Sequence, residues 1–411
     1  MSSSGIDHRS VGILGAGTMG AGIAQVAACA GWIVHLMDVD EPTVRAAIGR
    51  IVGQLDRLVE KGRMTAEARD ATAARLHAAT SPRDFEDAKL VIEAIVENLD
   101  VKAAALCRII PALRDDAIIA TNTSSLSVTK IGQASGLPHR TCGMHFFNPA
   151  PIMKLCEVIA GDDTLPTVVD RVAAIAESWG KVVARATDVP GFIVNHVARP
   201  YYLEALRIIE DGLAPPDATD AAMRDIGGFR MGPLELTDLI GQDVNAATTR
   251  SVWEQLGRPP LLAPSRLQES LVAAGHLGRK TKRGIYDYSS DKPAPAIDIE
   301  TKPFAPGVEL LNAANAFTAA AVEKPDDDLS NYIFARILAG LIVQALLARE
   351  RGVASPADID TALRHGVNYP RGPFEWARTI GTDRVTNLLE ALDATVDDGR
   401  FKVPVSLAAS V

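Results

Sequence analysis

The stretch SVGILGAGTMGAGIAQVAACAGWIVHLMD, residues 10–38, decides the fold. Apolar residues run over 11–14 and 33–37, and the glycine-rich turn after the first run opens into an alanine-rich segment from near Met19 to Gly31. This order is typical of a strand, a tight turn, a helix and a second strand. Gly31 suits the end of the helix, because glycine adopts the left-handed backbone that often closes one. The stretch therefore predicts a β-α-β unit.

A GxGxxG motif fills the turn; its members are Gly15, Gly17, Thr18, Met19 and Gly20. The first glycine allows the tight turn, the second lets the backbone approach a pyrophosphate, and the third lets the helix pack closely on the strand. The helix N-terminus attracts the anion. Asp38 follows the second strand, eighteen residues beyond Gly20, where a carboxylate can bind a ribose hydroxyl and repel a 2′-phosphate. This context predicts an NAD site; a glycine-rich turn without a ligand is the alternative.

The remaining N-terminal sequence alternates between short apolar runs and helical patterns. Strands are expected over 89–96, 117–122, 142–147, 154–160 and 181–186, and residues 43–80 have a helical period. Strands that alternate with helices form a mostly parallel, doubly wound sheet. We therefore expect a Rossmann-like α/β domain over residues 8–187.

The composition changes at 187–192, where Asp188 suits a helix N-cap and Pro190 a first helical turn. Helices are expected in a C-terminal domain over 188–288, and again over 329–411. The proline-rich and polar segment that starts at 289 predicts a linker over 289–328.

The two helical segments repeat each other at an offset of 140 residues. The matched positions are Gly212 and Gly352, Pro216 and Pro356, Asp220 and Asp360, Arg224 and Arg364, Gly232-Pro233 and Gly372-Pro373, Glu235 and Glu375, Gly241 and Gly381, and Asp243 and Asp383. No gap is needed, which predicts two copies of one all-α domain. Asn195 of the first copy falls opposite Ala335 of the second.

His145 and Glu157 lie on either side of a proline-containing turn centred near Pro151, within GMHFFNPAPIMKLCEVI, residues 143–159. If the two flanking strands form a hairpin, both residues are equally far from the turn and face each other. A carboxylate beside an imidazole fixes its tautomer, which suits a general base. A parallel arrangement would cancel this geometry, and the alternative is a structural histidine with an unrelated glutamate.

Polar side chains also follow two other predicted strands. Asn122 and Ser124 follow the strand at 117–122, while Glu97 and Lys102 follow the strand at 89–96. Ligands of open α/β sheets bind outside the carboxyl ends of the strands, so these residues are candidates for substrate or cofactor contacts. A helix cap rich in serine and threonine is the alternative for the first pair.

Composition excludes several classes of protein. The 411 residues carry a formal net charge of −9, which disfavours nucleic-acid binding. No metal site is expected, and the four cysteines form no CxxC pair and read as buried thiols of a reducing compartment. No apolar run approaches the length of a membrane span and no secretory signal is apparent, so we expect a cytoplasmic protein that neither crosses nor binds a membrane.

The chain resembles the L-3-hydroxyacyl-CoA dehydrogenase family over nearly its whole length. The resemblance rests on GAGTMGAGIAQ, EAIVENLDVK, TNTSSL, HFFNPAPIMKLCEVI, DVPGFIVN and GPLELTDLIG, in that order. It implies a Rossmann-like NAD domain followed by helical domains, and NAD-dependent oxidation of the 3-hydroxyl of an acyl-CoA thioester. Short or dicarboxylic acyl chains, in fatty-acid or aromatic-acid catabolism, are expected from the members with a duplicated tail.

The resemblance also implies roles for single residues. His145 would be the general base and Glu157 its orienting partner. The expected substrate contacts are Ser124, Asn148 and Asn195, with Gln54 and Lys61 as candidates for holding CoA. Asp38 would bind the adenosine ribose, and the nicotinamide end would be lined by Glu97, Lys102 and Asn122. A solvated helix residue is the alternative for Lys61.

The sequence departs from the family at two points. The motif that usually continues Asn-Arg reads Asn195-His196 here, which puts the role of that arginine in doubt. The repeated helical segment is absent from single-copy members, and in two-copy relatives it replaces a dimer partner, so a homodimer or a monomer with an internal pseudo-dimer is expected. A related hydroxyacid dehydrogenase would use a helical-domain lysine where Asn195 stands, and a silent NAD-binding protein would not need the full set of polar residues.

Overall fold

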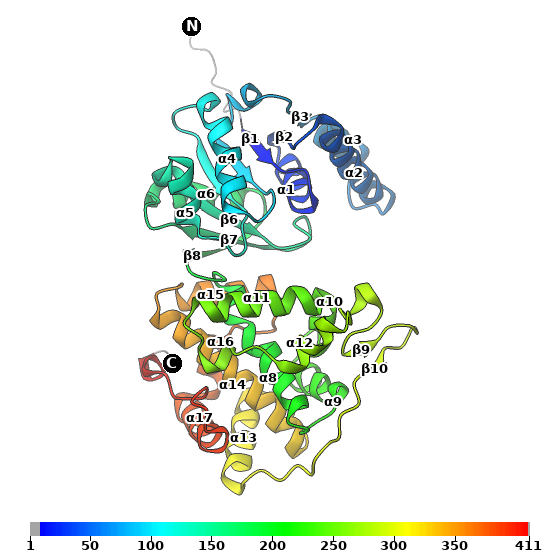
Figure 1. The fold of residues 1–411 in the computed structure, drawn as a ribbon, viewed down its shortest axis with the longest axis vertical. Coiled ribbons are helices and arrows are strands. Elements are labelled where there is room, and N and C mark those ends of the chain that lie inside the picture. Colours follow the sequence, from blue (N-terminus) through cyan, green and yellow to red (C-terminus); the bar gives the residue numbers. More distant parts are fainter. Residues whose placement is uncertain (1–8, 410–411) are drawn as a thin grey trace. The chain divides into compact units, whose positions relative to one another are not determined.

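The computed structural model describes residues 9–409, and the chain forms two compact units that are divided between Val189 and Pro190 (Figure 1). Residues 1–8, where the first domain is expected to begin and where no secretory signal is expected, lie outside the described residues. The first unit is an α/β domain with a Rossmann-like sheet, and the second is helical.

The first unit is built on an eight-stranded sheet with the order β3-β2-β1-β4-β5-β6-β7-β8. The strands are β1 (Ser10–Leu14), β2 (Ile33–Met37), β3 (Leu76–Ala78), β4 (Leu90–Glu93), β5 (Ile118–Thr121), β6 (Thr141–Phe146), β7 (Leu155–Ala160) and β8 (Val182–Thr187). All neighbouring pairs are parallel except β6 and β7, which are antiparallel. The strand order reverses at β1, where open α/β sheets bind ligands.

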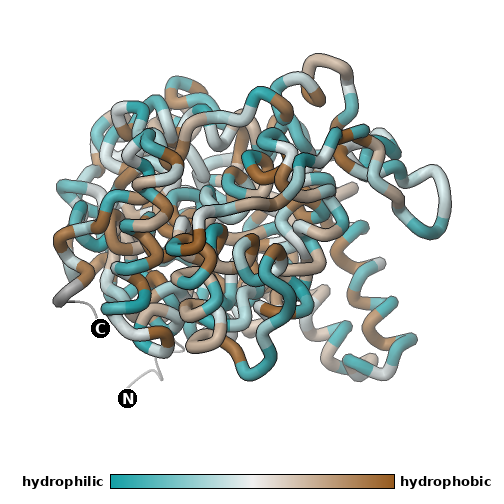
Figure 2. Tube along the Cα trace, turned by 90° about the horizontal axis from the view of Figure 1, so that it is seen from below, coloured by the Kyte–Doolittle hydropathy of each residue, from teal (hydrophilic) through white to brown (hydrophobic). Residues whose placement is uncertain are grey.

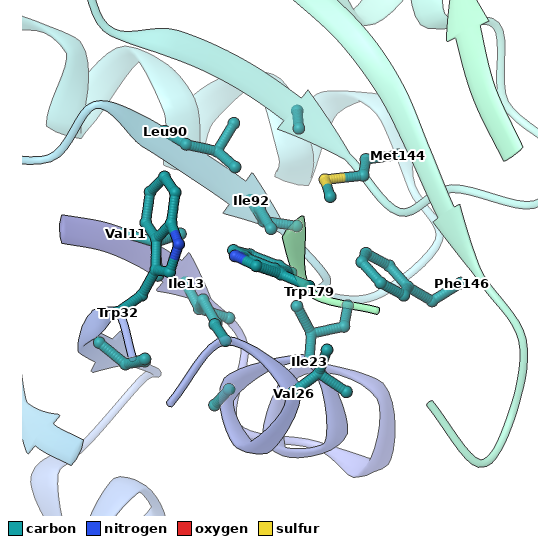
Figure 3. Packing of buried hydrophobic residues seen from close by; sticks show 14 of the residues in the cluster. Val11, Ile13, Ile23, Val26, Trp32, Leu90, Ile92, Met144, Phe146 and Trp179 are labelled. Carbon is teal, nitrogen blue, oxygen red and sulfur yellow. The ribbon is translucent and has the colours of Figure 1, made fainter. Parts of the chain in front are cut away.

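Helices cover both faces of this sheet. They are α1 (Thr18–Cys29), α2 (Glu41–Glu60), α3 (Ala66–Ala73), α4 (Leu99–Ile109), α5 (Val128–Ser135) and α6 (Pro166–Ser178), with short 3-10 turns at Pro82–Phe85, Ile110–Ala112 and Pro138–Arg140. One face packs against α1, α2 and α6, and Figure 3 shows Trp179 between Trp32 and Phe146. The two indole rings meet edge to face at 5.5 Å between centroids. The other face packs against α4 and α5.

The predicted β-α-β unit at residues 10–38 is confirmed. Strand β2 has the predicted bounds, β1 begins one residue early, and α1 starts at Thr18 and gives way to a positive-φ Gly31 after Ala30. The helical prediction for 43–80 holds for α2 and α3 but is wrong for residues 76–78, which form β3. These three residues pair with β2 at the edge of the sheet, and such a short strand leaves no clear period in the sequence.

Asp188 caps a different helix from the one expected. Its carboxylate accepts hydrogen bonds from the backbone N–H groups of Val128 and Thr129 and from the Ser127 hydroxyl, at 3.0, 2.8 and 2.6 Å. It thus satisfies the N-terminus of α5 rather than the start of the helical unit. The segment that leaves β8 is thereby fixed to the first unit.

The second unit consists almost entirely of helices. They are α7 (Val194–Val197), α8 (Arg199–Glu210), α9 (Pro216–Ala221), α10 (Pro233–Ile240), α11 (Gln242–Gln255), α12 (Arg266–Ala273), α13 (Val308–Ala321), α14 (Asp328–Glu350), α15 (Pro356–Gly366), α16 (Pro373–Ile380) and α17 (Thr382–Val396). A π-type turn spans Ala222–Ile226, and 3-10 turns span Pro260–Leu262, Arg279–Thr281 and Val405–Ala409. Two residue pairs, β9 (Tyr286–Asp287) and β10 (Ala294–Pro295), form a small antiparallel ribbon.

Helix α14 is the centre of this unit and contacts α8, α13 and α16. It is long and apolar enough to span a bilayer, so the expectation that no apolar run has this length is wrong. Its apolar window is 94% buried among the other helices, as in the core helix of a soluble domain. Figure 2 shows hydrophobic and hydrophilic residues alternating along other helices, which is the pattern of elements with one face in a core.

Part of the expected linker is also helical. Helix α13 lies within residues 289–328 and packs against α14 and α17, with Leu310 and Phe317 buried. Its alanine-rich sequence has good helix propensity, but the prolines just before it dominate the composition of the segment. Residues 296–307 carry no regular helix or strand.

Candidate active site

The glycine-rich turn has the geometry of an anion cradle at the switch point of the sheet. Gly15 has a φ of 104°, and a Cβ there would lie 2.5 Å from the carbonyl oxygen of Ala94. A Cβ on Gly20 would lie 1.8 Å from the Gly15 carbonyl oxygen, so α1 packs against the turn only because this residue is glycine. A Cβ on Gly17 would meet nothing within 4 Å, which leaves open space at the helix N-terminus.

Helix α1 begins in that open space without a side-chain cap. Gly17 is the N-cap residue and provides no side-chain acceptor, so the first N–H groups and the helix dipole can receive an anion. Thr18 is exposed at the first helical position. Met19 is half-buried and packs against the core, so it supports the helix and is a less direct candidate for a cofactor contact.

Asp38 lies beside this cradle at the end of β2. Its Oδ2 accepts a hydrogen bond from the Ala16 N–H and its Oδ1 accepts one from the Val39 N–H, both at 2.6 Å. Each carboxylate oxygen keeps a second lone pair, so the group can still accept from a ribose hydroxyl. Arg50 of α2 donates to the Ala16 carbonyl oxygen at 3.2 Å, which places a cation near the same loop. These residues fit a dinucleotide with a free 2′-hydroxyl.

A buried ion pair lies beneath the loop that follows β4. The Nζ of Lys102 is 2.6 Å from Oε1 of Glu93, and the two side chains are 1% and 0% exposed. Glu93 also accepts from the Thr121 hydroxyl at 2.7 Å and from the Ile95 N–H at 2.8 Å. Lys102 is therefore enclosed by protein partners. The sequence predicts a cofactor contact for Lys102, but its position suits it better to hold the loop. Sequence reasoning missed Glu93, which holds Lys102 in place.

Glu97 ties this loop to the polar segment after β5. One of its oxygens, Oε1, accepts from the Thr123 hydroxyl at 2.6 Å, from the Ser124 N–H at 3.0 Å, and from the N–H and hydroxyl of Ser125. Partial burial raises the pKa of Glu97, but these bonds and the nearby charge of Lys102 together bring the pKa below its usual value. The carboxylate is thus held ionised, and the exposed Ser124 is fixed at the sheet edge.

His145 and Glu157 are directly opposite each other in the antiparallel pair of β6 and β7. Nδ1 of His145 lies 2.6 Å from Oε2 of Glu157, with 6% of His145 and none of Glu157 exposed. The predicted hairpin register is therefore confirmed. Because Nδ1–H donates to a carboxylate, the ring carries its lone pair on Nε2, which is the atom that can take up a proton. The Phe147 ring lies 4.6 Å from the imidazole, centroid to centroid.

Two predicted site asparagines follow β5 and β6. Oδ1 of Asn122 accepts a hydrogen bond from the Phe146 N–H at 2.8 Å, which joins the end of β5 to the end of β6 next to His145. Asn148 is exposed in the turn that follows β6. The carboxyl ends of β1, β4, β5 and β6 thus bring the cradle, Glu97, Asn122, Ser124 and His145 to one edge of the sheet.

The other predicted site residues belong to α2 and to the helical unit. Gln54 and Lys61 are exposed on α2 and at its C-cap, seven residues apart and so on one helix face. Asn195 lies on α7 of the helical unit, where its Oδ1 is 3.4 Å from Nη2 of Arg199. His196 is buried with its Nδ1 3.1 Å from the Pro190 carbonyl oxygen, and burial lowers its pKa to about 4.

Known proteins provide independent evidence on this architecture. Residues 10–189 match the family model described as 3-hydroxyacyl-CoA dehydrogenase, NAD binding domain, and residues 191–288 and 332–409 match its C-terminal domain. The 3-hydroxyadipyl-CoA dehydrogenase of Escherichia coli K12 is 38% identical over 98% of this chain and 97% of its own. The 3-hydroxybutyryl-CoA dehydrogenase of Bradyrhizobium diazoefficiens is 40% identical over 70% of this chain and 98% of its own.

A solved structure agrees with both results. The crystal structure of a 3-hydroxybutyryl-CoA dehydrogenase from Escherichia coli K12 superposes with a TM-score of 0.87 at 36% identity, and covers 98% of each chain. The similarity thus extends through both units. The chain belongs to the 3-hydroxyacyl-CoA dehydrogenase family, with an NAD-binding domain followed by the family's helical C-terminal domain.

Proposed function

We propose that the chain catalyses the reversible oxidation of an (S)-3-hydroxyacyl-CoA to the 3-oxoacyl-CoA, with NAD⁺ reduced to NADH and one proton released. The observation that carries this proposal is the buried His145–Glu157 pair at the ligand-binding edge of an NAD-binding domain. Oxidation of an alcohol requires a base for the hydroxyl proton, and an imidazole oriented by a carboxylate supplies one.

Bound NAD supplies the hydride acceptor, and the chain's own residues do the rest. The dinucleotide would be held at its pyrophosphate and ribose by Gly15, Gly17, Thr18, Gly20 and Asp38, while Met19 supports the helix that follows the turn. His145 accepts the hydroxyl proton at Nε2, and Glu157 stabilises the imidazolium that results. Ser124, Asn148 and Asn195 orient the reacting oxygens.

The loop residues act around this centre. Glu97 and Asn122 line the nicotinamide end, and their hydrogen bonds to Ser124, Ser125 and Phe146 support this role. Lys102 acts through Glu93 and Glu97, because its ammonium is buried between them. On α2, the exposed Gln54 and Lys61 bind CoA, with Lys61 giving a local positive charge for its phosphates on an acidic chain.

We further propose that the helical unit consists of two copies of one domain. Asp220 accepts from the N–H groups of Leu234 and Glu235 at 2.8 and 2.9 Å, and Asp360, 140 residues later, accepts from those of Phe374 and Glu375 at 2.8 and 3.1 Å. The relative from Bradyrhizobium diazoefficiens covers only 70% of this chain, as a single-copy protein would. The second copy would then stand in for a dimer partner within one chain, so the enzyme is a monomer with an internal pseudo-dimer or a homodimer.

The substrate is a short or dicarboxylic acyl-CoA. This is supported by the relatives, whose names specify a four-carbon acyl group in one case and a six-carbon dicarboxylic one in the other. The corresponding roles are β-oxidation of fatty acids or catabolism of aromatic acids. The location we propose is the cytoplasm, with which four free cysteines agree, although Cys29 and Cys107 are exposed and not buried as expected.

The test is the change in nicotinamide absorbance with acetoacetyl-CoA and NADH. We expect the wild-type enzyme to oxidise NADH and the His145→Ala variant to lose at least 100-fold in kcat, as for the removal of a general base. The exposed His139, held at the carbonyl oxygen of Asp163, offers a matched control, and His139→Ala should keep wild-type activity. Turnover of free hydroxy acids but of no thioester would contradict the proposal.

A further inference from the structure

Arg199, the first residue of α8, is a buried cation without a carboxylate partner among the described residues. Its Nη1 and Nη2 reach only Oγ1 of Thr249 and Oδ1 of Asn195, both at 3.4 Å, and its Nε has no partner. The guanidinium lies over the Tyr202 ring at 4.9 Å. Burial lowers the pKa of Arg199 from its ordinary value, but arginine stays charged.

The other four buried lysines and arginines in residues 9–409 are better satisfied. Lys102 is paired with Glu93, and both Arg336 and Arg400 are paired with Glu204. Lys181 donates to the carbonyl oxygens of Ala150 and Met153 at 2.5 and 2.8 Å. An uncompensated buried charge destabilises a fold, so the environment of Arg199 is suited to an anion that comes from outside the chain.

The position of Arg199 indicates what that anion is. The guanidinium borders Asn195, the residue of the helical unit that the proposed function places on the substrate. The two residues lie on consecutive helices, α7 and α8, and their side chains meet, with Nη2 of Arg199 3.4 Å from Oδ1 of Asn195. In an extended six-carbon acyl chain the last carbon lies roughly 6 Å from the thioester carbon, given carbon–carbon bonds of about 1.5 Å, so a terminal carboxylate can reach a cation that lies next to a residue in contact with the thioester.

We propose that Arg199 binds the terminal carboxylate of a dicarboxylic 3-hydroxyacyl-CoA and thereby determines specificity for this substrate class. The proposal rests on the dehydrogenase function and names the acyl group it acts on. A guanidinium can hold a carboxylate through two parallel N–H···O bonds, which makes the contact strong and selective. A four-carbon 3-hydroxybutyryl group has neither the length nor the charge to form it.

The experiment compares 3-hydroxyadipyl-CoA with 3-hydroxyhexanoyl-CoA, which has the same number of carbons and no carboxylate. We expect the wild-type enzyme to have the higher kcat/KM for the dicarboxylic thioester. Arg199→Met should lower the adipyl-to-hexanoyl ratio of kcat/KM by roughly 30- to 100-fold, since a hydrogen-bonded charge contact to substrate is lost. Arg199→Lys keeps the charge but cannot form two parallel hydrogen bonds. Its adipyl-to-hexanoyl ratio of kcat/KM should therefore lie between those of the wild type and Arg199→Met.

The matched control is Lys302→Met, which removes one positive charge from an exposed position of the same unit and should leave the ratio unchanged. A wild-type ratio of one or less overturns the proposal whatever the variants do. Equal losses on both thioesters in Arg199→Met, or the failure of both Arg199 variants to fold, would assign Arg199 to the support of Asn195 or of the helices. If the wild-type enzyme oxidises neither thioester, it is the dehydrogenase function that fails.

Discussion

Glu204 and Arg336, which lie 132 residues apart in the chain, form an ion pair in the core of the helical unit. Nε of Arg336 is 2.9 Å from Oε2 of Glu204, and the side chains are 2% and 0% exposed. Burial raises the pKa of Glu204, but the charges of Arg207, Arg336 and Arg400 outweigh this effect and bring the pKa to about 2. The pair joins α8 of the first proposed copy to α14 of the second.

Glu204→Gln should therefore destabilise the helical unit by about 3–5 kcal/mol at pH 7, because it leaves buried guanidinium groups without their carboxylate. In the wild-type protein, ionised Glu204 adds to the free energy of unfolding above pH 4.5, and this contribution is lost as the pH falls towards 2. The free energy of unfolding of the variant should not show this decrease. Urea unfolding at several pH values measures both effects. The exposed pair of Asp243 and Lys280 is the control, and Asp243→Asn should cost less than about 1 kcal/mol.

His196 should make the same unit sensitive to mild acid. Its folded-state pKa of about 4 is below the ordinary 6.5, so between these values the unfolded chain binds a proton that the folded chain does not. The free energy of unfolding should then fall as the pH drops from 6.5, by about 2 kcal/mol at pH 5. His196→Gln should remove this fall.

The measurement is the difference between wild-type and His196→Gln stability at pH 7.5 and at pH 5. Asp220 and Asp360 have pKa values raised to about 7 and 6, mainly by burial, and these produce the opposite trend. Both aspartates are present in each protein, so their effect cancels in the difference. Parallel stability curves for the two proteins would show that folding does not lower the pKa of His196.

Asp38 should control the choice between NAD and NADP. Asp38→Ser removes the charge that repels a 2′-phosphate, while Arg50 stays beside the same loop. We expect the ratio of kcat/KM for NADP to that for NAD to rise at least about tenfold, given the size of a near-surface charge interaction. Adding Arg50→Ala to this variant should reverse the gain.

Asp40 provides the control for that experiment. It lies two residues beyond Asp38, but its carboxylate caps α2 by accepting from the Thr43 N–H. Asp40→Asn removes one negative charge, as Asp38→Ser does, but it should leave the preference for NAD over NADP unchanged. If both substitutions change the preference to the same degree, the general charge of the loop decides it and Asp38 has no specific role.

Much of the α/β fold could be predicted, because local signals and tertiary packing agree there. The GxGxxG turn predicts the β-α-β unit with which the first unit begins. The equal distances of His145 and Glu157 from one turn were enough to predict that they face each other. The strand β3 could not be found, since three residues pair only through contact with β2. The membrane-span length of α14 was missed because Arg336 divides its apolar residues into two shorter runs.

The site was predicted less completely than the fold. Sequence spacing brought Glu97, Asn122 and Ser124 to strand ends, but it could not show that Lys102 is buried on Glu93. A glutamate in the apolar run KLVIEAIV, with a lysine nine residues later, was the available signal. Arg199 gave no signal, because only the absence of a carboxylate around it in three dimensions sets it apart.

The central claim is that Glu157 acts through His145. We would measure kcat/KM for wild type, His145→Gln, Glu157→Gln and the double variant with a 3-hydroxyacyl-CoA thioester. His145→Gln should lose roughly 10²- to 10⁴-fold and Glu157→Gln less, and the double variant should lose no more than His145→Gln alone, because the two residues form one unit. A loss in the double variant equal to the product of the single losses, or near wild-type activity in His145→Gln, would contradict the account.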